Sequence, residues 1–262
     1  MSLLFDRVNP ARPAAAYHPP LIWASVGAFF AAVLALGVSF GPFTSAVAAL
    51  LLGLAVIPGW PVLMGVENRV VSRVVMLLTL AAALPAAYFG TIKTTAVVAA
   101  GAIIAAFIGE MFRRDGHVKL VEHMSASVAG AMMMVSASLW VHAGGAWNED
   151  VYSRLDPGPT VGLTIAIVIA VAALIHGFDS PNAGWLGTLN AMVTGAVSAY
   201  LLGGPVWMGL FAGAAVGVVY AGVQRALTAF ERPLTWVQGI TKALVPHCSL
   251  GVIGYIFTMI LL

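Results

Sequence analysis

The sequence predicts an all-α protein, a polytopic transmembrane helix bundle of about nine helices. Of its 262 residues, 61% are hydrophobic and only 8% are charged, and the mean hydropathy is +0.98. A water-soluble domain carries about a quarter charged residues, so this composition cannot cover a surface that faces water. The apolar residues also fall into nine stretches near the roughly 20 residues that cross a bilayer. These stretches are 20–40, 43–64, 70–89, 94–111, 124–143, 160–178, 184–202, 205–223 and 248–262.

The basic residues support the same helix count and orient the chain. If the N-terminus is cytosolic, nine crossings place ten of the twelve Lys and Arg residues on the cytosolic side, and Lys93 and Arg154 outside. Cytosolic loops of membrane proteins are enriched in Lys and Arg, and removing any one helix would spoil this partition. We therefore predict a cytosolic N-terminus, an outer C-terminus and a multi-pass protein of the cytoplasmic (cell) membrane. The cytosolic group is Arg7, Arg12, Arg69, Arg73, Arg113, Arg114, Lys119, Arg225, Arg232 and Lys242.

Two further divisions of the chain follow from its pattern. Residues 1–19 contain three prolines and lack the apolar core of a signal peptide, so we expect a cytosolic N-terminal tail. Residues 20–262 then form a single integral membrane domain. Within it, residues 224–247 space Leu234, Val237, Ile240 and Leu244 along one helical face, which predicts a cytosolic segment lying in the headgroup layer.

The eighth stretch contains a row of small residues. Gly209, Gly213 and Gly217 recur every four residues, which puts them on one face of a helix. Without side chains on that face, a neighbouring helix can approach closely. We interpret the row as packing within the monomer.

Histidines and cytosolic charges are the candidates for chemistry. His123, His176 and His247 fall near the cytosolic boundary and could meet in space, but no close pair or Cys/His/Asp spacing predicts a metal site. Arg113 and Arg114, in the loop 109–123, would attract anionic lipid headgroups or simply fix the topology. A local ion pair with these arginines is the simplest explanation of Glu110.

One connection, "HGFDSPNAGWLG" (176–187), is unusually rich in turn and polar residues. Ser180 followed by Pro181 is a favourable helix start, and Gly184 and Gly187 permit close packing. The same helix N-terminus would also present free N–H groups to an anion, with Asp179 just before it. Local physics leaves both interpretations open.

The segment "SPNAGWLG" resembles the Ser-Pro-Lys-Lys-Thr-Trp-Glu-Gly segment of the phosphatidate cytidylyltransferases (CDP-diacylglycerol synthases). Ser180, Pro181, Trp185 and Gly187 match it. Near the C-terminus, "LVPHCSLGVIGYIF" is similar to the segment before that family's last helix, with His247 among the matching positions. The resemblance spans about residues 95–262 and implies a helical membrane fold with cytosolic polar loops.

The departures from that family concern its chemistry. Asn182 and Ala183 stand at its two Lys positions, and Leu186 stands at its Glu position. In the family, cationic side chains meet phosphate and paired acids hold a divalent metal, which Asn, Ala and Leu cannot do. The resemblance therefore implies a degenerate member that lacks most catalytic residues.

Three hypotheses about function follow. The first is a non-catalytic membrane protein with a cytidylyltransferase-like scaffold that binds lipid or acts as an assembly partner, without nucleic acid or cofactor. The second is a membrane enzyme that transfers a nucleotidyl or phosphate group on a phospholipid or polyprenyl phosphate, with Mg²⁺ and with Asp179, Glu110, Asp115 and His247. The third is a permease or lipid flippase. The candidate ligand or headgroup residues are Asp179, Ser180, Trp185, Gly187, Arg113, Arg114 and His247.

Overall fold

The computed structural model describes residues 20–113, 119–144, 157–177, 183–228 and 235–261, and these residues form helices and turns without a strand. The all-α prediction is confirmed. The helical segments are α1 (Pro20–Ser39), α2 (Pro42–Val56), α3 (Trp60–Leu63), α4 (Arg69–Phe89), α5 (Ile92–Met111), α6 (Leu120–Ser138), α7 (Trp140–Ala143), α8 (Pro157–His176), α9 (Ala183–Leu201), α10 (Val206–Thr228), α11 (Trp236–Ser249) and α12 (Gly251–Leu261).

The twelve segments in the described part of the chain group into nine rods, because α2–α3, α6–α7 and α11–α12 each continue across a short break. Seven rods are long and apolar enough to cross a membrane. The described part of α8, Thr160–His176, is a shorter apolar helix. Polar residues such as Asn190 lower the hydropathy of α9, which is not among the seven. The rods follow the nine predicted stretches in order.

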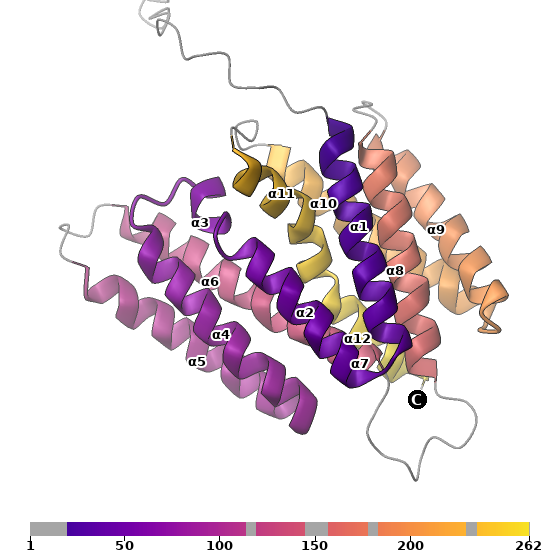
Figure 1. Cartoon of the computed structure of the whole chain (residues 1–262), viewed down its shortest axis with the longest axis horizontal. Coiled ribbons are helices and arrows are strands. Elements are labelled where there is room, and N and C mark those ends of the chain that lie inside the picture. Colours follow the sequence, from indigo (N-terminus) through magenta and orange to yellow (C-terminus); the bar gives the residue numbers. More distant parts are fainter. Residues whose placement is uncertain (1–19, 114–118, 145–156, 178–182, 229–234, 262) are drawn as a thin grey trace, which may run out of the picture.

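The rods form two groups with a central layer between them (Figure 1). On one side α4, α5 and α6 pack against one another, and on the other side α8 packs against α9 and α10. α1, α2 and the rod α11–α12 lie between these groups, and α11 contacts both α6 and α10. α1 begins at one end of the bundle, and α12 ends at the opposite end (Figure 1).

Burial separates the protein core from the surface that faces lipid. Trp140, Leu52 and Met134 are fully buried at the centre of the bundle. Large apolar side chains are exposed along the outer helices, for example Val97 on α5 (71%) and Val193 on α9 (63%). In water this surface would drive aggregation, whereas in a bilayer it contacts acyl chains.

The glycine row of α10 packs against α9, as predicted. A Cβ on Gly209 would lie 2.1 Å from the carbonyl oxygen of Gly195, and one on Gly213 would lie 2.2 Å from that of Ala191. A Cβ on Gly217 would lie 2.8 Å from Cα of Thr188. The two backbones therefore touch along the row, which any larger residue would prevent.

The last rod differs from the prediction. Residues 236–247 were expected in a cytosolic interfacial segment, but α11 is the first half of a 25-residue candidate span, Trp236–Ile260. Thr241, Leu244 and His247 of α11 are all fully buried. The Thr241 hydroxyl and the His247 Nε2–H find acceptors inside the bundle, at the carbonyls of Val56 and Gly27, so these two polar residues are accommodated in the span.

The break between α11 and α12 is held by α6. The Ser136 hydroxyl donates to the carbonyl of Ser249 (3.0 Å) and accepts from the N–H of Val252 (3.1 Å). Gly251 lies against the same residue, since a Cβ there would be 1.9 Å from the Ser136 carbonyl oxygen. Trp140 Nε1–H donates to the His247 carbonyl (3.1 Å). These bonds satisfy backbone groups that a continuous helix would satisfy itself.

Candidate functional site

The residues predicted for a ligand site do not all fall in the described part of the chain. Asp179, Ser180 and Arg114, together with Asp115, lie outside the described residues. Trp185 lies on α9 with 57% of its surface exposed, so its indole is not packed between helices. Gly187 faces the imidazole of His176, and a Cβ there would be 2.8 Å from Cε1. Close packing at Gly187 is therefore confirmed, whereas the prediction for Gly184 is wrong, since a Cβ there would meet nothing within 4 Å among the described residues.

Arg113 lies in a buried charge cluster at the end of α5. Its Nη1 donates to Oε2 of Glu110 at 2.6 Å, and both side chains are almost fully buried. The same nitrogen contacts Nδ1 of His123, a residue of α6. His123 is also buried, with 1% of its surface exposed. The predicted local ion pair of Glu110 is confirmed, and the imidazole of His123 joins it.

His123 links this cluster to the loop between α3 and α4. The N–H of Glu67 lies 3.4 Å from its Nε2, and the Glu67 carboxylate pairs with Lys119 at 3.2 Å. A neutral imidazole has one acceptor nitrogen, so it accepts from either Arg113 or Glu67 at a given moment. The Glu110–Arg113–His123 cluster thus ties together the end of α5, the start of α6 and the loop between α3 and α4.

His247 belongs to a second buried cluster, built from α1, α8, α10 and α11. Its Nε2–H donates to the carbonyl of Gly27 (2.9 Å), which leaves Nδ1 as an acceptor without a partner among the described residues. The ring of Tyr220 lies between His247 and His176, with centroid distances of 6.3 and 5.0 Å. His176 and His247 are therefore brought together through Tyr220, whereas His123 is not part of this cluster.

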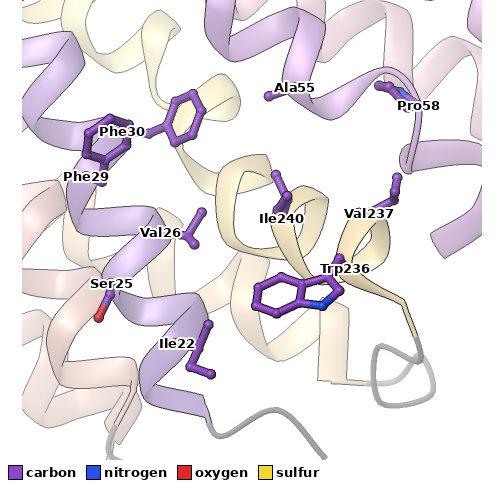
Figure 2. Close-up of a pocket in the computed structure, with 10 residues that line it drawn as sticks. All are labelled: Ile22, Ser25, Val26, Phe29, Phe30, Ala55, Pro58, Trp236, Val237 and Ile240. Atoms are coloured by element: carbon purple, nitrogen blue, oxygen red, sulfur yellow. The ribbon is translucent and has the colours of Figure 1, made fainter. Parts of the chain in front are cut away.

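A groove lies between α1, α2 and α11, and its volume is about 680 Å³. Nine of its ten lining residues are apolar, and the hydroxyl of the tenth, Ser25, donates to the Leu21 carbonyl (2.9 Å). Figure 2 shows α1 and α11 as facing walls, with the end of α2 beyond them. The lining residues are Ile22, Ser25, Val26, Phe29, Phe30, Ala55, Pro58, Trp236, Val237 and Ile240.

Local packing sets the width of this groove. Trp23 of α1 and Trp236 of α11 meet edge to face, with ring centroids 5.1 Å apart. Gly239 lets them approach, since a Cβ there would be 2.2 Å from the Trp23 ring. The corner after α2 is fixed to α11 at Thr241, whose hydroxyl donates to the Val56 carbonyl (3.4 Å). Tryptophan side chains favour the membrane–water interface, which indicates that the groove begins at that level.

One cation is bound to a residue of the groove. Arg73, on α4, is half-buried, and its Nη2 donates to the carbonyl of Pro58 (2.8 Å). Its Nε–H is buried and has no acceptor within the described residues. No carboxylate pairs with Arg73 in the described part of the chain. The polar group beside the groove is thus a guanidinium with unused donors.

Sequence reasoning missed this groove. Arg73 was one of the basic residues that predicted the orientation of the chain. Its position in the sequence, however, gave no indication that it lies next to Pro58, which is fifteen residues away and beyond a helix break. The groove itself is assembled from three segments that are far apart in the chain. The sequence signal that could have pointed to it is Trp236, since an indole is typical of the membrane–water interface.

Comparisons with protein-family models, with curated proteins and with solved structures found no match to this chain. The resemblance to the phosphatidate cytidylyltransferases therefore stays a prediction. Among the described residues, no group of three or more His, Cys, Asp or Glu side chains is arranged to hold a metal ion.

Proposed function

We propose that this multi-pass membrane protein binds a membrane lipid in the groove between α1, α2 and α11, and that it acts as a non-catalytic lipid-binding or assembly component. The observation that carries the proposal is the apolar groove of about 680 Å³ on a membrane-embedded bundle. Its volume lies in the range of pockets that hold small molecules. Its lining offers an acyl chain continuous apolar contact and no competing polar group.

The position of the groove supports a lipid of one leaflet. On α1 the lining runs from Ile22 to Phe30, which corresponds to about 12 Å along a helix axis. Half of a hydrocarbon core of about 30 Å is close to this length. The groove lies at the end of the bundle that the basic residues assign to the cytosol. A lipid of the cytosolic leaflet therefore fits it best.

The predicted family resemblance agrees with this class of ligand, since phosphatidate cytidylyltransferases act on a phospholipid. The departures at Asn182, Ala183 and Leu186 favour binding over nucleotidyl transfer. A membrane-protein partner that receives or senses the lipid is part of the same proposal.

Filling the groove tests the proposal. In Val26→Trp, an indole occupies the space between α1 and α11 where a chain would lie, so the protein purified in mild detergent should retain less phospholipid per molecule than the wild type. Phospholipid that remains bound is counted by native mass spectrometry. Ile240→Trp fills the groove from the opposite wall and should act in the same direction.

Val97→Trp is the matched control, because Val97 is 71% exposed on the outer face of α5. It adds the same side chain to the general lipid-facing surface. If both groove variants stay folded and retain as much phospholipid as Val97→Trp, the groove is not a lipid site.

A further inference from the structure

The strength of lipid binding in this groove cannot come from its apolar lining. A lipid tail is as apolar inside the bilayer as it is against Val26 or Phe30, so moving a chain into the groove gains no hydrophobic free energy. A polar contact has to supply the preference for one lipid over another. One charged group is bonded to a residue of the groove lining, because the Arg73 guanidinium donates to the Pro58 carbonyl.

From this placement we infer that Arg73 binds the phosphate of an anionic phospholipid whose chain lies in the groove; the inference rests on the function proposed above. A guanidinium has five N–H donors, and its fork fits two phosphate oxygens at once. The structure uses Nη2 for the Pro58 carbonyl, a bond that fixes the guanidinium next to a groove-lining residue. Nε–H is buried, and the donors of this half-buried side chain that remain available to an anion are those of the two Nη atoms.

The charges nearby favour an anion. Arg69 precedes Arg73 by one helical turn and is exposed. The acidic side chain on the loop before α4, Glu67, forms an ion pair with Lys119 at 3.2 Å. Because Arg73 is half-buried, a phosphate bound there is screened less by salt than one at an exposed cation.

This assignment differs from the headgroup site expected from the sequence. Of the two arginines predicted to bind a headgroup, Arg113 lies in the described part of the chain. It is 6% exposed, and its Nη1 already contacts Glu110 and His123. Arg73, by contrast, has no acidic partner in the described ranges and is bonded to the groove-lining Pro58. The headgroup site therefore moves from the end of α5 to the first turns of α4.

Lipid titration of the full-length protein, followed by native mass spectrometry, tests the inference. The wild type should bind phosphatidylglycerol more tightly than phosphatidylcholine with the same chains, because choline brings a positive charge towards Arg73. Arg73→Gln should weaken phosphatidylglycerol binding by about tenfold and phosphatidylcholine binding less, because choline already balances the phosphate charge of that lipid, whereas diacylglycerol with the same chains has no phosphate and should bind as before. Arg73→Lys, which keeps the charge but not the fork, should restore part of the selectivity.

Controls separate this inference from the proposed function. Arg225→Gln removes an exposed cation of α10 and should leave the selectivity unchanged. If Val26→Trp weakens both lipids while Arg73→Gln preserves the preference for phosphatidylglycerol, the groove binds lipid but Arg73 is not its phosphate ligand. If Arg73→Gln weakens the binding of diacylglycerol as much as that of phosphatidylglycerol, the role of Arg73 is only to hold Pro58, and the inference is wrong.

A free phosphate is distinguished in the same experiment. Inorganic phosphate should not displace bound phosphatidylglycerol, because it lacks the chain that the groove holds. Displacement by inorganic phosphate in the wild type, absent in Arg73→Gln, would show a site for free phosphate and would overturn the assignment to a lipid.

Discussion

At the scale of single residues, the buried polar side chains are where this protein departs from a simple apolar bundle. Glu110 is fully buried, and one of its carboxylate oxygens, Oε1, has no partner among the described residues. The other oxygen holds Arg113. Such a pair adds little net stability over apolar residues, but removing one partner leaves a buried charge uncompensated.

We therefore expect Glu110→Gln to destabilise the protein by about 3–5 kcal/mol, because Arg113 would stay buried without its counter-charge. The loss should appear as a lower thermal unfolding midpoint in detergent. Glu67→Gln, which removes only the half-exposed pair with Lys119, should change stability by less than about 1 kcal/mol. Equal effects of the two variants would contradict the burial of the Glu110–Arg113–His123 cluster.

At the scale of helices, close backbone contact decides which elements pair. α9 and α10 touch along Gly195, Gly209 and Gly213, where the carbonyl oxygens of one helix lie against the glycines of the other. The apolar surfaces alone would not select this pairing, since lipid solvates them equally well. Small residues provide the selection because they allow contacts that a side chain would block.

Two substitutions on α10 separate the effect of space from that of helix propensity. In Gly213→Ala the new Cβ would lie 2.2 Å from the Ala191 carbonyl oxygen, so the helices must move apart at a cost of about 1–3 kcal/mol. In Gly222→Ala the Cβ meets nothing within 4 Å, and alanine should leave stability unchanged or raise it slightly. Thermal unfolding of both variants measures the difference. A neutral Gly213→Ala would argue against the α9–α10 contact.

At the scale of the whole molecule, the distribution of charge is the dominant feature. Nine rods place the start of α1 and the end of α12 at opposite ends of the bundle (Figure 1). The basic residues cluster at the end where α1 begins, in the first turns of α4 and near the ends of α5 and α10. By the positive-inside rule we expect this end to be cytosolic.

A phosphatase reporter, which is active only outside the cytosol, should accordingly be active when it is fused to the C-terminus and inactive when it is fused to the N-terminus. A fluorescent reporter that matures only in the cytosol should show the opposite pattern. Reporter activity in intact cells is the measurement, with phosphatase-type and fluorescent reporters as complementary readouts. A C-terminal fusion that is active in the cytosol would show that the number of crossings is even.

The sequence by itself determined the fold class, the order of the nine rods and the contact face of α10. These properties depend on local quantities: the length of apolar runs, the spacing of glycines and the sign of nearby charges. The boundary of the last rod was harder to predict, because His247 looks unsuited to a membrane span until the Gly27 carbonyl of α1 supplies its partner.

Only the tertiary structure decided the groove and the position of Arg73. Val26, Pro58 and Ile240 come from three segments that local pattern does not connect, and a bend after α2 brings the Pro58 carbonyl to the guanidinium. At the level of sequence Arg113 is a candidate for binding a lipid headgroup, but in the folded protein it neutralises Glu110. The physical reason is that a cation's role depends on which acid lies beside it in space, and chain order alone does not show this.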